Sequence, residues 1–218
     1  MKPADVSCLI RAAGLGSRLG LGPKAWVELA GQPLLEWALQ PVRGRVGRVI
    51  VAVTPESVDA ARRRWGHEAH VMAGGHSRWD TTRRLADVVD TPWVMLHDTV
   101  HPLVSVGVVA DLLEAAERTG AAVPALPIED FVWDDEDDRI RPPRHTRIIQ
   151  TPVVLRRDVL RAGISLLEGN TASLGAEASV IEVLSALGQP WAFVDGDPRN
   201  LKVTHRGDLD VAAALLGS

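Results

Sequence analysis

Short apolar runs and amphipathic helical stretches alternate along almost the whole of this 218-residue chain. Runs such as VSCLI at 6–10 and RVIVAVT at 48–54 are continuously apolar, as expected of strands that are buried on both faces of a sheet. Stretches between the strands, such as PESVDAARRRWG at 55–66, carry apolar residues at helical spacing. Because such strands need crossover helices, the pattern predicts an α/β fold with a mostly parallel sheet.

The other predicted elements continue this order to the end of the chain. No internal repeat and no linker rich in Gly, Ser or Pro divides the sequence, so we expect a single domain over 1–218. Ser105 and Gly120 are expected to cap the strongest helix. Further strands are predicted at 70–75, 92–98, 121–128 and 191–197, and helices at 33–42, 77–89, 105–120, 151–169, 179–188 and 208–216.

Residues 129–150 interrupt the alternation. They contain two short β-like pieces around the acidic run DDEDD, which predicts a β-hairpin inserted into the domain. Neighbouring carboxylates repel one another unless a fixed geometry holds a cation between them, so the run is interpreted as a solvated turn.

Composition excludes several classes of partner. The formal net charge is −4 and no dense Lys/Arg stripe is present, so the chain lacks the basic footprint of a nucleic-acid-binding protein. No apolar run is long enough to cross a bilayer, and we find no signal-peptide pattern. The one cysteine, Cys8, is expected to be a buried, inert thiol. We therefore expect a cytoplasmic protein that binds neither nucleic acid nor membranes.

A glycine-rich loop directly follows the first predicted strand. Residues 12–26, AAGLGSRLGLGPKAW, hold four glycines together with Arg18 and Lys24. Leu19 stands where a dinucleotide fingerprint has its third glycine, and no Ser or Thr follows the lysine as in a P-loop. Glycines nevertheless let backbone N–H groups approach an anion, at the end of the sheet where α/β proteins bind ligands. The loop is thus either a structural turn or a phosphate site.

This loop is the first of five motifs. The others are GGHSRWDTT, VMLHDTVHPLV, QTP and NLKVTHRGDLDVA. In this order and at these gaps the set resembles the IspD-like cytidylyltransferases over nearly the whole chain. The resemblance implies a Rossmann-like nucleotidyltransferase fold whose protruding hairpin arm, here 129–150, embraces a second subunit. It also implies transfer of CMP from CTP to a phosphorylated alcohol, 2-C-methyl-D-erythritol 4-phosphate in the best-known members, which releases pyrophosphate and serves isoprenoid precursor synthesis.

The resemblance assigns roles to residues of this chain. It implies that Arg18 and Lys24 grip the triphosphate, that Lys202 positions the acceptor phosphate, and that Asp98 lies near the acceptor and a Mg²⁺ ion bound with the CTP phosphates. An acceptor phosphate is already ionised near pH 7, so the site has to hold two polyanions in line rather than supply a general base. The other positions implied to bind substrate are Ala12, Ala13, Gly14, Gly16, Gly75, Thr81, His101 and Thr151.

The acceptor half of the pattern departs from the family. His101 replaces the arginine of the usual DAARP motif, and GAEA at 175–178 replaces TDDA or TDEA. Pro143 stands where the arm arginine that reaches the acceptor belongs. Its neighbour Arg144 is assigned that catalytic role, and Arg141 is the alternative. Histidine cannot copy the charged, forked donor set of arginine, so these changes alter the chemistry of one subsite.

Several interpretations therefore stay open. The acceptor is either 2-C-methyl-D-erythritol 4-phosphate or another phosphate or phosphonate of a specialised pathway. A homologue that binds the nucleotide without turnover is a third possibility, although Lys202 would then have no use. A dehydrogenase conflicts with the misplaced glycine. Single residues also have structural alternatives: Asp98 as a helix cap, and His97 and His101 as structural histidines, since no third metal ligand has a matching spacing.

Overall fold

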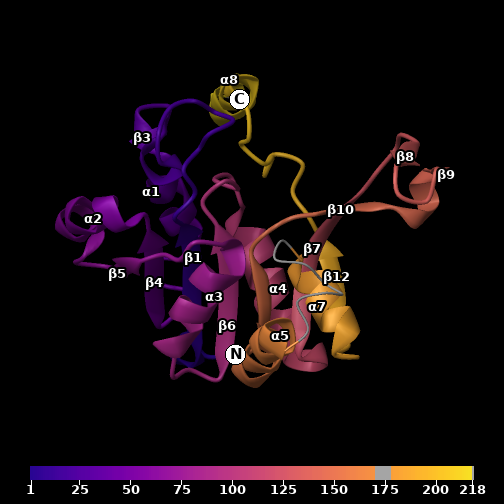
Figure 1. Ribbon diagram of the computed structural model, residues 1–218, viewed down its shortest axis with the longest axis horizontal. Coiled ribbons are helices and arrows are strands. Elements are labelled where there is room, and N and C mark those ends of the chain that lie inside the picture. The colour runs from indigo at the N-terminus through magenta and orange to yellow at the C-terminus, as the bar shows by residue number, and fades with distance from the viewer. Residues whose placement is uncertain (170–177, 218) are drawn as a thin grey trace.

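A central sheet organises the computed structural model, which describes residues 1–169 and 178–217 (Figure 1). Its strands are β1 (Val6–Ala12), β4 (Arg48–Val53), β5 (His70–Ala73), β6 (Trp93–Asp98), β7 (Ala121–Pro127), β10 (Arg147–Ile149), β11 (Val153–Arg156) and β12 (Ala192–Asp195). They follow the order β10-β7-β11-β6-β1-β4-β5, and β12 pairs with β7. The β6-β1-β4-β5 half is parallel throughout, as is the β7–β12 pair, whereas β11 and β10 are antiparallel to their neighbours. The predicted α/β class with a mostly parallel sheet is confirmed.

Helices cover both faces of the sheet. One face carries α1 (Leu34–Leu39), α2 (Val58–Trp65) and α4 (Val106–Thr119), and the other carries α3 (Arg78–Asp87), α5 (Arg157–Gly169) and α7 (Val180–Ala186). The last helix, α8 (Arg206–Leu216), packs in a third, smaller apolar cluster with the glycine-rich loop (Figure 1). Short elements complete the chain: η1 (Pro3–Asp5), η2 (Lys24–Trp26), β2 (Glu28–Leu29), β3 (Gln32–Pro33), η3 (Gln40–Val42), η4 (Pro55–Ser57) and η5 (Pro143–His145).

The strand β1 shows why the strands of this sheet are apolar at successive positions. Cys8 and Ile10 are fully buried in the cluster beneath α1, α2 and α4, whereas Leu9 is fully buried in the cluster beneath α3, α5 and α7. Successive side chains of a strand point to opposite faces, so a strand covered on both faces must be apolar at every position. The buried Cys8 agrees with the expected structural thiol, and burial raises its pKa.

The caps predicted for the longest helix are confirmed. The Ser105 side chain accepts a hydrogen bond from the backbone N–H of Val108, and α4 ends at Gly120, which has a left-handed φ of 88°. Glycine adopts that conformation without the steric cost of a Cβ atom.

The expectation of one helix over 151–169 is wrong in its first part. Val153–Arg156 is the strand β11, and the helix α5 begins only at Arg157. Val153, Val154 and Leu155 are buried between β6 and β7, because three apolar side chains in a row, two of them β-branched valines, fit a strand that is covered on both faces.

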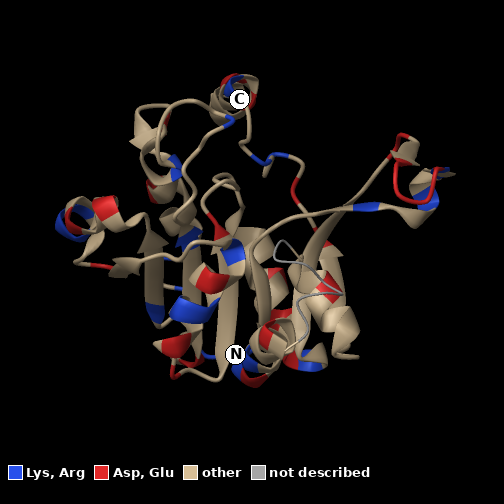
Figure 2. Ribbon diagram, viewed as in Figure 1, with Lys and Arg blue, Asp and Glu red and all other residues tan. Residues whose placement is uncertain are grey.

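The predicted hairpin projects from the sheet as an arm (Figure 1). Its two antiparallel strands are β8 (Val132–Asp134) and β9 (Arg139–Arg141), joined by the acidic turn that Figure 2 shows in red at the tip. In that turn Asp134 accepts backbone N–H groups and pairs with Arg141, as a solvated turn should. The end of the 129–150 segment differs from the expectation, because β10 joins the main sheet beside β7. No helix among the described residues is long and apolar enough to span a membrane.

Candidate active site

Three segments that are far apart in the sequence meet at the carboxyl ends of the parallel strands. The loop after β1, the start of α3 after β5 and the end of β6 enclose a cleft of about 600 Å³, which Lys202 closes from the C-terminal side. Ten residues predicted to form the site line this cleft: Ala12, Ala13, Gly14, Gly16, Arg18, Lys24, Gly75, Thr81, Asp98 and Lys202. The fold thus brings together residues that were singled out from motifs up to 190 positions apart.

The glycine-rich loop presents its backbone to the cleft. The Lys24 N–H donates to the Gly14 carbonyl at 2.9 Å, and the Gly20 N–H donates to the Gly16 carbonyl at 2.9 Å, which closes the loop on itself. Within residues 1–169 and 178–217, the backbone N–H groups of 14–18 donate to no other group. Free backbone N–H groups in a glycine-rich loop that lines a cleft can bind an anion, which favours a phosphate site over a structural turn.

We expect Gly16→Ala to disrupt this loop. Gly16 has a left-handed φ of 68°, and a Cβ atom there would lie 2.3 Å from the Gly22 carbonyl oxygen, so the backbone would have to move. The expected result is a loss of CTP affinity of at least about 10-fold, since a shift of about 1 Å in a positioning loop can cost far more. Calorimetric titration with CTP measures it. Gly31→Ala is the matched control, because Gly31 also has a positive φ but no atom within 4 Å of the added Cβ. Equal CTP affinity in both variants would contradict the prediction.

Three cations converge on one side of the cleft. Lys24 is half-buried, and its Nζ donates to the Val203 carbonyl at 3.2 Å. Burial lowers the pKa of Lys24, and the positive charges of Arg18 and Lys202 lower it further. The chain has only three lysines, and two of them stand here. Like charges that are held together without an anion repel one another, and a bound polyanion relieves that repulsion.

The shifted pKa of Lys24 predicts an alkaline limit on nucleotide binding. Because the pKa lies below the ordinary 10.5, the ammonium charge is lost at a lower pH than on a free lysine, and the attraction for CTP is lost with it. We expect kcat/KM for CTP to fall with a midpoint below pH 10.5. In Lys24→Arg the charge persists throughout this range, so its alkaline limb should disappear. A limb of unchanged position in Lys24→Arg would show that another group titrates.

The start of α3 supplies the opposite wall. The Gly75 N–H donates to the Thr81 hydroxyl at 2.9 Å, and the His76 N–H donates to Asp80 at 3.0 Å. A Cβ atom on Gly75 would collide with the Asp80 side chain at 2.1 Å, so this turn requires glycine. Trp79 is buried and its indole N–H donates to the Ala178 carbonyl at 2.8 Å, which makes it a packing residue.

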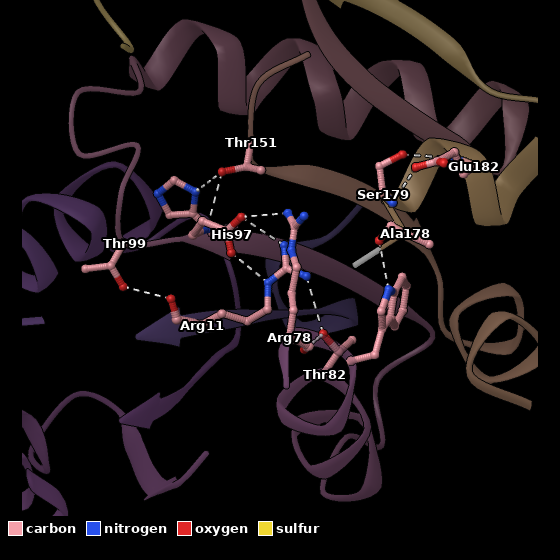
Figure 3. A network of polar contacts seen from close by, with 11 residues as sticks. Arg11, Arg78, Thr82, His97, Thr99, Thr151, Ala178, Ser179 and Glu182 are labelled. Atoms are coloured by element: carbon pink, nitrogen blue, oxygen red, sulfur yellow. Dashed lines mark hydrogen bonds and ion pairs between the residues drawn. The ribbon is translucent and has the colours of Figure 1, made fainter. Parts of the chain in front are cut away.

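Asp98 is held between two arginines that also line the cleft, Arg11 and Arg78, both labelled in Figure 3. Arg11 donates to Asp98 through Nε to Oδ1 at 2.7 Å and through Nη2 to Oδ2 at 3.1 Å, and Arg78 donates to Oδ2 at 2.9 Å. Burial alone would raise the pKa of Asp98, but the two guanidinium groups outweigh it and hold the pKa well below its usual range. Ser105 caps α4, and the side chain of Asp98 bonds only to these arginines within the described residues, so the helix-cap alternative fails.

Three residues assigned to substrate binding or catalysis lie outside the cleft. Thr151 is buried behind it, where its hydroxyl accepts the Asp98 N–H at 3.2 Å. His101 is buried and its Nδ1 lies 3.2 Å from the Asn200 carbonyl oxygen. Arg144 is exposed on the arm and donates to the neighbouring His145. The roles of all three stay predictions.

Other residues of the acceptor half have structural surroundings. Burial lowers the pKa of His97 to about 3, and its Nδ1 lies 3.2 Å from the Thr151 hydroxyl, so His97 is a neutral structural histidine. Arg141, the alternative arm arginine, is paired with two carboxylates of the acidic turn. Gly175 and Ala176, where the sequence departs from the TDDA motif, lie outside the described residues.

Sequence reasoning missed Arg11 and Arg78. Arg78 lies within the quoted GGHSRWDTT motif but was not singled out there. Arg11 is the one charged residue of the strand VSCLIRA, and its side chain is only 6% exposed. A buried arginine needs an anionic partner, so a charge inside an otherwise apolar strand was the available signal.

The residues of the cleft could supply only one protein ligand to a Mg²⁺ ion, so most of its ligands would have to come from the nucleotide and water. Mg²⁺ in nucleotide sites takes one or two carboxylates and completes its shell with phosphate oxygens and water. Asp98 is the one carboxylate lining the cleft among the described residues, and its Oδ1 accepts a single hydrogen bond, which leaves a lone pair free. No group of three or more His, Cys, Asp or Glu side chains suited to a metal occurs in the described part of the chain.

The fold and the cleft define a nucleotide-binding α/β protein of the nucleotidyltransferase class. Comparison with known proteins agrees: the sequence profile of the family described as "IspD: 2-C-methyl-D-erythritol 4-phosphate cytidylyltransferase" matches residues 6–218. An enzyme of that name from Thermus thermophilus is 38% identical over 214 residues, which cover 97% of each chain. One from Deinococcus radiodurans is 36% identical over 97% of this chain and 89% of its own.

Solved structures give the same result. The crystal structure of a Thermus thermophilus enzyme of this name superposes with a TM-score of 0.81 at 34% identity and covers 98% of this chain and 100% of its own. A synthase structure from Anaerococcus prevotii has a TM-score of 0.83 at 20% identity over 99% of this chain and 97% of its own, which supports the fold alone. The chain belongs to the 2-C-methyl-D-erythritol 4-phosphate cytidylyltransferase (IspD) family, whose members are CTP-dependent cytidylyltransferases.

Proposed function

We propose that this protein transfers CMP from CTP to 2-C-methyl-D-erythritol 4-phosphate, releases pyrophosphate and so serves isoprenoid precursor synthesis. The observation that carries the proposal is the convergence of Arg18, Lys24 and Lys202 on one cleft whose loop offers free backbone N–H groups. A protein that only bound the nucleotide would have no need of three cations placed for two polyanions. Relatives at 36–38% identity over the full chain carry the name of this activity.

The chain's residues perform the proposed reaction by electrostatics. The glycine-rich loop, Arg18 and Lys24 hold the triphosphate, so that an oxygen of the acceptor phosphate attacks the α-phosphorus in line and the bond to the β-phosphate oxygen breaks. Negative charge that develops on the leaving pyrophosphate is met by Lys24 and the loop N–H groups. Oδ1 of Asp98, together with the CTP phosphates, would hold Mg²⁺, which when bound supplies further positive charge to the phosphates.

The acceptor is tested by pyrophosphate release from CTP with a panel of phosphorylated alcohols and phosphonates. We expect 2-C-methyl-D-erythritol 4-phosphate to give the highest kcat/KM. The burial of His101, which lowers its pKa and so disfavours a positive charge where the family has an arginine, is the observation that favours a different acceptor, which would then lead the panel. Silence across the panel, with CTP still bound, would establish a non-catalytic homologue. Loss of turnover after treatment with EDTA, and its return with Mg²⁺, tests the metal.

We also propose that two copies of the protein form a homodimer through the arm. We propose further that the enzyme is cytoplasmic. The arm exposes large apolar side chains that its own chain leaves uncovered: Phe131 is 72% exposed and Trp133 is 54% exposed. Exposed apolar patches on a projecting segment are typical of an interaction site. We expect a dimer mass by light scattering at micromolar concentration. Trp133→Glu should shift it toward monomer, and a monomeric wild-type protein would overturn the proposal.

A further inference from the structure

Arg78, which bonds to Asp98 and lines the cleft, has no role in the proposed transfer reaction as described so far. Arg78 is the first residue of α3, directly after Ser77, whose side chain caps the helix. Its side chain is 33% exposed and lines the cleft, whereas Arg11 on the other side of Asp98 is 6% exposed. Arg11 also borders the cleft but is almost wholly enclosed in protein, so Arg78 is the one of the two with substantial side-chain surface open to a ligand.

The hydrogen bonds of Arg78 leave most of its donors free. Nη2 donates to Asp98 Oδ2 at 2.9 Å, and Nε and Nη1 donate to no group in the described part of the chain. Arg11 donates two hydrogen bonds to Asp98, so the carboxylate is fixed and in turn holds the guanidinium of Arg78; Figure 3 labels both arginines. A guanidinium held by one edge presents its remaining N–H groups as a fork, which matches two oxygens of a phosphate.

The cations of the cleft come from different segments. Arg18 and Lys24 belong to the glycine-rich loop, whereas Arg78 bonds to Asp98 at 2.9 Å at the end of β6, and Lys202 lines the same cleft. The positive charges of Lys202 and Arg78 both act on His101, in agreement with the two lying near each other. In an in-line transfer, the attacking oxygen approaches from the side opposite the leaving pyrophosphate. Since the loop holds the pyrophosphate end, the acceptor phosphate belongs away from the loop, where Arg78 bonds to Asp98.

His101 cannot provide a cation at this end. It is only 5% exposed, its ring faces the Asn200 carbonyl, and it is not part of the cleft wall. Burial lowers its pKa below the ordinary 6.5, so the ring is neutral at pH 7. Of the two arginines that border the cleft beside Asp98, Arg78 is the one whose side chain is substantially exposed.

We propose that Arg78, oriented by the Arg11–Asp98 pair, binds the phosphate of the acceptor together with Lys202 and so determines specificity for a phosphorylated alcohol. The inference rests on the proposed transferase function and names the residue that reads its second substrate. It separates two anion subsites: Arg18 and Lys24 for the nucleotide, and Arg78 and Lys202 for the acceptor.

The test compares, in Arg78→Gln, the change in KM for the acceptor with the change in Kd for CTP. We expect KM for 2-C-methyl-D-erythritol 4-phosphate to rise about 10- to 100-fold, the range for the loss of charged hydrogen bonds, while the Kd for CTP by calorimetry changes less than about threefold. Arg78→Lys keeps the charge but loses the fork, and its KM should lie between those of Arg78→Gln and wild type. Arg63→Gln, on the exposed face of α2, is the charge-matched control and should equal wild type.

Each outcome has one meaning. An unchanged acceptor KM in Arg78→Gln, with CTP binding intact, overturns the inference and leaves the transferase function standing. An equal loss of affinity for CTP and acceptor overturns it as well, because Arg78 would then serve the triphosphate. If the wild-type protein prefers another phosphorylated alcohol, the same KM comparison is made with that acceptor. If wild type turns over no phosphorylated acceptor, the proposed function and the inference fail together.

Discussion

Replacing Lys24 with alanine should nearly abolish turnover while leaving the protein folded. The loss of one preorganised cation at a phosphoryl-transfer site is expected to cost about 10²–10³ in kcat/KM for CTP. Stability should not fall, because burial and the charges of Arg18 and Lys202 disfavour the Lys24 ammonium in the free protein, as its lowered pKa shows. Steady-state pyrophosphate release and urea unfolding of the same preparation measure both effects.

The control comes from the small number of lysines in the chain. Lys2 is exposed near the N-terminus, so Lys2→Ala removes the same charge from the same residue type without touching the cleft. Its rate should equal that of wild type. Near-normal turnover in Lys24→Ala would remove Lys24 from the triphosphate site, and an equal loss in both variants would mean that net charge alone is responsible.

The second large effect should appear in stability. Asp98→Ala leaves the guanidinium of Arg11, 6% exposed, without its anionic partner. Removal of one member of a buried ion pair typically lowers the free energy of unfolding by about 3–5 kcal/mol, because the remaining charge stays desolvated. Urea denaturation at pH 7 should show this loss as a lower midpoint with an unchanged slope.

A second substitution distinguishes the buried charge from simple loss of packing. In Arg11→Met/Asp98→Ala the stranded cation is gone, so most of the lost stability should return. Arg11→Met alone should be milder, since Asp98 keeps Arg78 as a partner. If the double variant is as unstable as Asp98→Ala, the cost does not come from the unpaired Arg11, and the description of this pair is wrong.

The strand β11 shows where local sequence was insufficient for the fold. Val153, Val154 and Leu155 directly precede a strongly amphipathic helix, so the apolar run was read as the first turns of that helix. Antiparallel pairing with β6 and β7 decides otherwise, and both partners are distant in sequence. A short apolar segment satisfies the strand and helix patterns equally, and its neighbours in space select between them.

The Arg11–Asp98 pair shows the same limit in the site. Asp98 was assigned to the site by the family resemblance of its motif, VMLHDTVHPLV, but its partner was not found. The two residues are 87 positions apart and become direct neighbours through the parallel register of β1 and β6. Register depends on how whole strands align. A charged residue inside an apolar run indicates only that it has an oppositely charged partner, not which residue that partner is.

By itself the sequence determined the alternation of strands and helices except at β11, the two-faced core and the glycine-rich, cationic loop, because burial on both faces and close approach to an anion restrict which residues each position tolerates. The tertiary structure decided which charges meet. It placed Lys24 beside Arg18 and Lys202, turned His101 away from the cleft and set Asp98 between Arg11 and Arg78. Charge pairing depends on distances of a few ångströms between segments far apart in the chain, and only the packed sheet and its loops set those distances.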